Sequence, residues 1–300
     1  MLWLDWIETQ NDCMISLVKQ WAEINSGSFN LEGLEIFLNE LQSSFQVLNG
    51  STQVIPLPPV HCINSQGHPS ERALGQALRI RKRPEAPVQV LLCGHMDTVF
   101  DTNHPFQHVK ELDANTLNGP GVADLKGGLV VILKALEAFE QSPFTENLGW
   151  EVLINPDEEV GSYGSQHLLQ EAASHNHWGL VFEPPISDTG ILAGNRKGHG
   201  KFSIVVRGQS AHAGREHHLG RNAICALARL ITSIDELNGL RSGVTLNIGN
   251  IEGGSAVNIV PDLAITNLET RVTSEEDGIW VKDQLEKLVD EANQVEGYHI

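Results

Sequence analysis

The sequence predicts an α/β protein in which helices cover a mostly parallel sheet and a smaller α+β domain follows. Short apolar runs at residues 88–93 and 150–154 have the length of buried strands. Segments with helical spacing follow them, at 127–139 and 165–173. Such alternation is typical of a parallel, helix-covered sheet. The alternation of strands and helices ends near residue 196, where a different order of predicted elements begins.

The first domain opens with two predicted helices, at residues 4–25 and 31–41, where apolar and polar positions alternate at helical spacing. Proline-containing turns at 56–59 and 83–87 separate them from the first buried strand. A third apolar run, at 180–182, is the last predicted strand of this domain.

The second domain follows the order strand, helix, strand, strand, helix. Its predicted elements are residues 201–206, 222–237, 244–251, 259–272 and 275–294. The last helix begins at a sequence resembling a capping box, Ser274-Glu-Glu-Asp277. This order is a β-α-β-β-α-β, ferredoxin-like unit without its last strand. We therefore expect domains at 1–196 and 197–300.

The chain ends at Gly297-Tyr-His-Ile300, where that last strand would begin. A sheet that lacks one strand has an exposed edge, which proteins usually avoid. We interpret the sequence as a C-terminally truncated piece of a longer protein, although a natural exposed tail is the alternative.

Charge and composition narrow the class of protein. The net charge is −18 and the pI is about 5.0, which argues against binding to nucleic acid or an anionic membrane surface. No apolar run approaches the ~18 residues of a membrane span, and the acidic N-terminus is unlike a signal peptide. Four dispersed cysteines without a C-x-x-C pair favour a reducing compartment. We expect a cytoplasmic protein.

Histidine and acidic residues follow four apolar runs, and these clusters are the main functional signal. They are His95 with Asp97, Asp124, Glu158 with Glu159, and Glu183, after the runs at residues 88–93, 119–123, 150–154 and 180–182. Side chains at the carboxyl ends of parallel strands converge on one crevice, so these groups are expected to meet. So many carboxylates need a neutralising partner, and a pair of divalent metal ions is the simplest one.

Each cluster also has an ordinary explanation. His95 and Asp97 lie two apart, so on an extended segment the carboxylate can accept an imidazole N–H, but both could merely face solvent. Asp124 lies in a glycine-rich loop and would alone be read as a helix N-cap. In the adjacent pair, one of Glu158 and Glu159 could bind metal while the other acts as general base. Such pairs are more often solvated surface charges.

Several longer motifs resemble the M20 metallopeptidase family in order and spacing. They are Gly94-His-Met-Asp-Thr98, Gly119-Pro-Gly-Val-Ala-Asp-Leu-Lys-Gly-Gly128, Asp157-Glu-Glu-Val-Gly-Ser-Tyr-Gly-Ser165, Phe182-Glu-Pro184, Ser210-Ala-His-Ala-Gly214 and Asn258-Ile-Val-Pro261. The match covers nearly the whole chain. The motif sequences are most similar to those of carboxypeptidase G2-like glutamate carboxypeptidases, with acetylornithine deacetylases and succinyl-diaminopimelate desuccinylases as near relatives.

The resemblance implies a zinc exopeptidase fold with an inserted dimerisation or lid domain, a homodimer, and two Zn²⁺ ions per active site, with Co²⁺ or Mn²⁺ as alternatives. It implies that Asp124 bridges the metals, that His95 and Glu183 bind one, and that Glu159 binds the other. Glu158 would be the general base and Asp97 the partner of His95. A cis peptide bond between Asp124 and Leu125 is also implied.

In the second domain the resemblance assigns His212 to stabilise the oxyanion in the partner subunit's active site. Asn258 and Arg271 would bind a substrate carboxylate. One further metal-ligating histidine is expected beyond residue 300, so the chain by itself is expected to be weakly active or inactive.

These features leave several functions to compare. The leading one is zinc-dependent release of glutamate from a small peptide or acyl conjugate. Deacylation of an N-acyl amino acid uses the same chemistry and stays open, as does a non-catalytic binding relative. A serine hydrolase is disfavoured because no Gly-x-Ser-x-Gly elbow is present.

Overall fold

The computed structural model describes residues 3–187 and 189–300, which divide into two compact units. The first unit contains Met1–Val60 and Glu71–Ile191, and the second contains His61–Ser70 and Leu192–Ile300. The boundary proposed between residues 196 and 197 lies close to the second junction. The upstream segment His61–Ser70, however, belongs to the second unit, which a single boundary does not describe.

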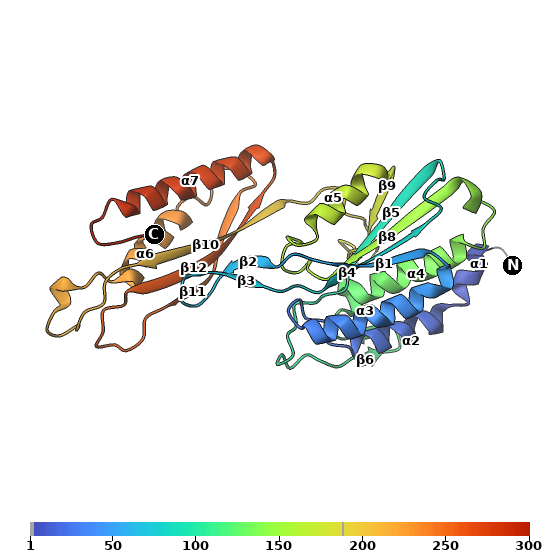
Figure 1. Cartoon of the computed structure of the whole chain (residues 1–300), viewed down its shortest axis with the longest axis horizontal. Coiled ribbons are helices and arrows are strands. Elements are labelled where there is room, and N and C mark those ends of the chain that lie inside the picture. Colours follow the sequence, from blue (N-terminus) through green and yellow to red (C-terminus); the bar gives the residue numbers. More distant parts are fainter. Residues whose placement is uncertain (1–2, 188) are drawn as a thin grey trace. The chain divides into compact units, whose positions relative to one another are not determined.

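Seven α-helices are present among the described residues, and the principal helices fall close to the segments predicted from the sequence (Figure 1). In the first unit they are α1 Trp3–Glu8, α2 Asn11–Ala22, α3 Leu31–Phe45, α4 Gly127–Phe139 and α5 Gln166–His175. In the second unit they are α6 Ala223–Asp235 and α7 Glu275–Asn293. Side chains cap three of them, because Asn30, Asn222 and Ser274 each accept an N–H from the first turn.

The first unit contains a five-stranded sheet in the order β1-β4-β8-β5-β9. Its strands are β1 Ser51–Pro56, β4 Gln76–Lys82, β5 Val88–His95, β8 Leu148–Asn155 and β9 Trp178–Val181. β5 is parallel to both β8 and β9, as expected. β4 is antiparallel to β1 and β8, so the sheet is mixed rather than mostly parallel.

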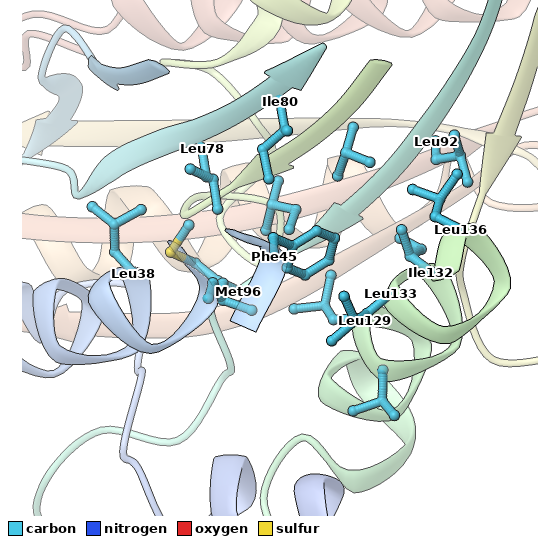
Figure 2. Packing of buried hydrophobic residues seen from close by; sticks show 14 of the residues in the cluster. Leu38, Phe45, Leu78, Ile80, Leu92, Met96, Leu129, Ile132, Leu133 and Leu136 are labelled. Atoms are coloured by element: carbon cyan, nitrogen blue, oxygen red, sulfur yellow. The ribbon is translucent and has the colours of Figure 1, made fainter. Parts of the chain in front are cut away.

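Helices cover both faces of this sheet. On one face, α2, α3 and α4 bury a cluster that includes Phe45 from α3, Leu78 and Ile80 from β4, and Leu129 and Ile132 from α4 (Figure 2). On the other face, α5 packs Leu168 and Ala172 against the neighbouring positions of the same strands. Alternate residues of β4, β5 and β8 therefore enter different cores, which fixes the register of these strands.

The apolar run at residues 119–123 is not a strand. Gly121 adopts a φ of 71°, and the chain then makes a tight, irregular turn over Val122–Lys126 that leads directly into α4. Two other expectations also change. β9 is exposed along its whole length, and the strand expected from residue 259 begins only at Leu263.

The second unit has a three-stranded antiparallel sheet in the order β10-β12-β11. Its strands are β10 Gly198–Arg207, β11 Thr245–Gly253 and β12 Leu263–Val272. The helices α6 and α7 pack on this sheet around a core that includes Val206, Leu227 and Leu268. His299 pairs with Arg207 through two backbone hydrogen bonds of 2.7 and 2.9 Å, at the free edge of β10.

Shorter strands complete the fold. They pair as two-stranded ladders, β2 Val60–Ile63 with β3 Pro69–Arg72, and β6 Lys110–Asp113 with β7 Thr116–Asn118. Within the described residues, none of the helices has the length and apolar character needed to span a bilayer.

Candidate functional site

Three adjacent parallel strands of the first unit end at one edge of the sheet, and the candidate residues follow those ends. His95 is the last residue of β5, Glu158 and Glu159 follow β8, and Glu183 follows β9. Because β5 lies between β8 and β9, their carboxyl ends meet in one place.

His95 is buried, with 1% of its surface exposed, and both ring nitrogens face acids. Nε2 lies 2.8 Å from Asp124 Oδ1 and 3.9 Å from Glu183 Oε1. Nδ1 lies 3.0 Å from the backbone oxygen of Asp97 and 3.3 Å from its Oδ1. Burial disfavours the imidazolium, but the hydrogen bonds with Asp124 and then Asp97 outweigh it and raise the pKa of His95 to about 11.

Asp97 is fully buried and connects three separate segments of the chain. Its Oδ2 accepts the hydroxyl of Ser28 at 2.7 Å. Its two carboxylate oxygens also accept the backbone N–H groups of Glu158 and Glu159, at 3.1 and 3.2 Å. One carboxylate thus positions the imidazole and the acidic pair together. Neither the Ser28 contact nor this bond to the acidic pair was predicted.

Asp124 lies in the irregular turn before α4, and not at the end of a strand. The peptide bond between Asp124 and Leu125 is cis, as the resemblance implies. Lys126 ties this turn to the end of α2 and the residues after it, because its buried ammonium donates to the backbone oxygens of Trp21 at 3.0 Å and Ile24 at 2.6 Å. Burial lowers the pKa of Lys126 to about 7. The Asp124 side chain itself stays 51% exposed.

Asp157 holds the loop after β8. It is fully buried and accepts the N–H groups of Gly164 and Ser165 and the hydroxyl of Ser165, at 2.9, 3.1 and 2.6 Å. The Asn155 side-chain amide also donates to it, at 3.1 Å. Asp157 belongs to one of the family motifs, but no role was predicted for it; its place directly before two acids is the only signal in the sequence.

The side chains of His95, Asp124 and Glu159 can hold a divalent metal ion. One ligand atom from each lies within 4.8 Å of the others. Burial and then the negative charge of Asp124 raise the pKa of Glu159 to about 7. One imidazole with carboxylates is a donor set that suits zinc and related ions. Glu183, within 3.9 Å of the same imidazole, extends the set.

Glu158 differs from Glu159 although the two are adjacent. Its side chain is exposed, and within the described residues its carboxylate forms no hydrogen bond or ion pair. Its backbone N–H is fixed by Asp97. A carboxylate with a fixed backbone and free oxygens is suited to accept a proton.

The remaining predicted residues lie in the second unit and fall into two places. The loop that carries His212 pairs with the loop that carries Asn258, through a bond of 3.0 Å from the Ala213 N–H to the Asn258 backbone oxygen. Arg271 lies near the far end of β12 and pairs with Glu269 at 2.6 Å.

Two family models match the chain, one in each half. Residues 195–296 match a peptidase dimerisation domain of M20 type, and residues 78–183 match peptidase family M28. The first match covers the β10–α7 region, and the second covers the sheet strands that carry the candidate site.

Known relatives and solved structures agree with those matches. Carboxypeptidase G2 of Pseudomonas sp. (strain RS-16) is 31% identical over 188 residues, covering 63% of this chain and 45% of the relative. A probable succinyl-diaminopimelate desuccinylase of Staphylococcus epidermidis is 27% identical, covering 68% and 58%. The chain thus spans about half the length of these relatives. An M20 family metallo-carboxypeptidase of Sulfolobus solfataricus shares the fold, with a TM-score of 0.67, 16% identity, and coverage of 95% and 77%.

Proposed function

Because this chain is a relative of the M20 metallopeptidases, we propose that it hydrolyses an amide bond beside a carboxylate at a divalent-metal centre. The leading reaction is release of a C-terminal glutamate, as the similarity to carboxypeptidase G2 suggests. The observation that carries the proposal is the buried Asp97 carboxylate, which aligns the His95 imidazole with the backbone of Glu158 and Glu159. A surface cluster of acids would have no need of such a partner.

The centre is proposed to hold two zinc ions, with Co²⁺ or Mn²⁺ as substitutes. Asp124 would be shared, His95 and Glu183 would bind one ion, and Glu159 the other. Asp124 supports the shared role because it lies beside His95 and within ligand distance of Glu159. Bound divalent ions polarise a carbonyl and make water more acidic.

The side chains of this chain supply the remaining chemistry. Asp97 holds His95 with Nε2 turned toward Asp124. Glu158 would take a proton from the attacking water and return it to the leaving nitrogen, because its carboxylate is free while its backbone is fixed. His212 and Asn258, which lie on paired loops, are proposed to meet the substrate in a homodimer, and Arg271 would contribute only by leaving Glu269.

Deacylation of an N-acyl amino acid is the second candidate. The similarity to a succinyl-diaminopimelate desuccinylase favours it, and the same residues would perform it. A substrate panel of acyl-glutamates, N-acetyl amino acids and dipeptides separates the two. The cytoplasm is the compartment we propose.

The test replaces Glu158 by glutamine and compares zinc content with turnover. Zinc content, measured by atomic emission, is expected to stay equal to that of the unaltered protein. The turnover number of the unaltered chain is expected to be low, because one further metal-ligating histidine is expected beyond residue 300, and Glu158→Gln should lower it by a further factor of about 10² to 10⁴, the usual contribution of a general base. Glu85→Gln, a change at an exposed acid in the turn before β5, is the matched control and should leave both unchanged. Full turnover in Glu158→Gln would refute the base role.

A further inference from the structure

A cavity of about 660 Å³ lies next to the candidate metal site in the first unit. Its walls come from the loop before α3, the loop after β5, the loop after β8 and the end of β3, and include Gly27, Phe29, Arg72, Thr98, Asp101 and Glu159. Glu159 belongs both to this cavity and to the metal-ligand group. A molecule in the cavity would therefore lie directly beside the reacting centre.

The cavity wall is firmly tied to Asp97. Ser28 bonds the Asp97 carboxylate, and its N–H donates to the backbone oxygen of Thr98 at 3.2 Å. Gly27 packs so closely that an added Cβ would lie 2.5 Å from the backbone oxygen of Phe100. This part of the wall is thus a fixed surface and not a loose loop.

Arg72 is the positively charged side chain of the cavity wall. Its guanidinium carbon lies 3.3 Å from the centre of the Phe29 ring, which covers one face of the planar group. Within the described residues it has no hydrogen bond or ion pair. Arg79, Arg83 and Arg271, by contrast, pair with Glu151, Glu140 and Glu269.

Stacking of this kind leaves the edge of the guanidinium free. Its N–H donors form a flat fork whose geometry matches both oxygens of a carboxylate. Asp101, the other charged group of the cavity that is not a candidate metal ligand, already accepts the Asn103 N–H at 2.9 Å. The cavity therefore contains the Arg72 guanidinium, whose N–H groups can bind a carboxylate next to the candidate metal site.

We propose that Arg72, stacked on Phe29, is the specificity residue of this site and binds a carboxylate of the substrate in the cavity beside Glu159. The inference rests on the proposed function for the position of the scissile amide. It identifies the substrate class as acidic amides, and it places their recognition on Arg72 rather than on Arg271.

Binding tests the proposal without any catalysis. Titration calorimetry on the metal-free protein would compare N-acetyl-L-glutamate with its neutral diamide, N-acetyl-L-glutamine amide. The protein should bind the acid at least about 10-fold more tightly, and Arg72→Gln should abolish that preference. Arg229→Gln removes the same charge from an exposed position on α6 and should keep the preference. Equal binding of the acid by the unaltered protein and by Arg72→Gln would overturn the proposal.

Kinetics on the zinc-loaded protein give a second readout. Arg72→Gln should raise KM for the acidic substrate by about 10- to 100-fold with kcat nearly unchanged, and Arg72→Lys should lie between. A fall in kcat without a change in KM would contradict the assignment. Absence of hydrolysis by the unaltered protein would count against the proposed function alone, since the calorimetric comparison still decides the role of Arg72.

Discussion

Asp97 and Asp124 lie on either side of the same imidazole, yet their surroundings are opposite. Asp97 has no exposed surface and accepts bonds from a hydroxyl and two backbone N–H groups in addition to facing His95. Asp124 is half exposed and faces His95 beside two other acids. The Asp97 carboxylate therefore stabilises the fold, whereas the Asp124 carboxylate is accessible to a bound metal ion. Residue type and distance from a histidine do not distinguish these roles, but the hydrogen bonds do.

The largest expected effect comes from Asp97→Ala in the metal-free protein. The change leaves the Ser28 hydroxyl and the N–H groups of Glu158 and Glu159 without their acceptor. The free energy of unfolding should fall by about 3–4 kcal/mol, measured by urea denaturation.

Asp101→Ala, four residues along the same loop, is its control. Asp101 is exposed and accepts only a local backbone N–H, so its removal should cost less than about 1 kcal/mol. Similar losses from both changes would mean that Asp97 is not the connection we describe.

Asp124→Asn should have the opposite profile. Asparagine keeps an oxygen that can accept from His95, so the unfolding free energy of the metal-free protein should change by less than about 1 kcal/mol. Zinc affinity, measured by competition with a chelating dye, should fall by about 100-fold because a ligand charge is lost. Unchanged zinc affinity would exclude Asp124 from the metal site.

The smallest effect is a pH dependence at Glu159. Its pKa in the folded protein is raised to about 7, from a value of 4.5 when unfolded, so its contribution to stability is lost as the pH rises from 4.5 through 7. In metal-free Glu159→Gln that loss is absent. The variant should therefore be more stable than the unaltered protein at pH 8 by about 1 kcal/mol, after allowance for solvent screening of a half-exposed group.

Unfolding curves at pH 4.5 and pH 8 would measure this difference. At pH 4.5 most of the advantage should disappear, because the glutamate is then largely protonated in the folded protein. An advantage that does not change with pH would assign the effect to packing instead of charge.

The sequence predicted the positions of the candidate residues best where an apolar run directly precedes them. The ends of β5 and β9 place His95 and Glu183 because strand length and direction alone decide where such residues lie. The glycine-rich loop that carries Asp124 and leads into a helix was predicted, but its composition does not reveal the positive φ at Gly121. The bonds from Asp97 to Glu158 and Glu159 span 61 and 62 residues, and no local pattern records them.

Strands before β5 were missed for a different reason. β4 is buried, yet its alternation includes Arg79 and Arg81, which read as surface residues. In the structure Arg79 pairs at 2.6 Å with the buried Glu151 of the neighbouring strand, so the charge is neutralised inside the fold. β1 is largely exposed and carries little apolar signal. Pairing between residues far apart in the sequence therefore explains why β4 was missed. The same kind of pairing brings the candidate site together.

The three bonds accepted by Asp97 also set an order of events during folding. Its partners lie 69, 61 and 62 residues away along the chain, so the carboxylate finds them only after long loops have closed. Before that closure, no Asp97 bond holds His95 and Glu159 beside each other. Capture of a metal ion with the affinity of the finished site therefore reports completed folding of the first unit, and metal added early in refolding would meet only scattered, weak ligands.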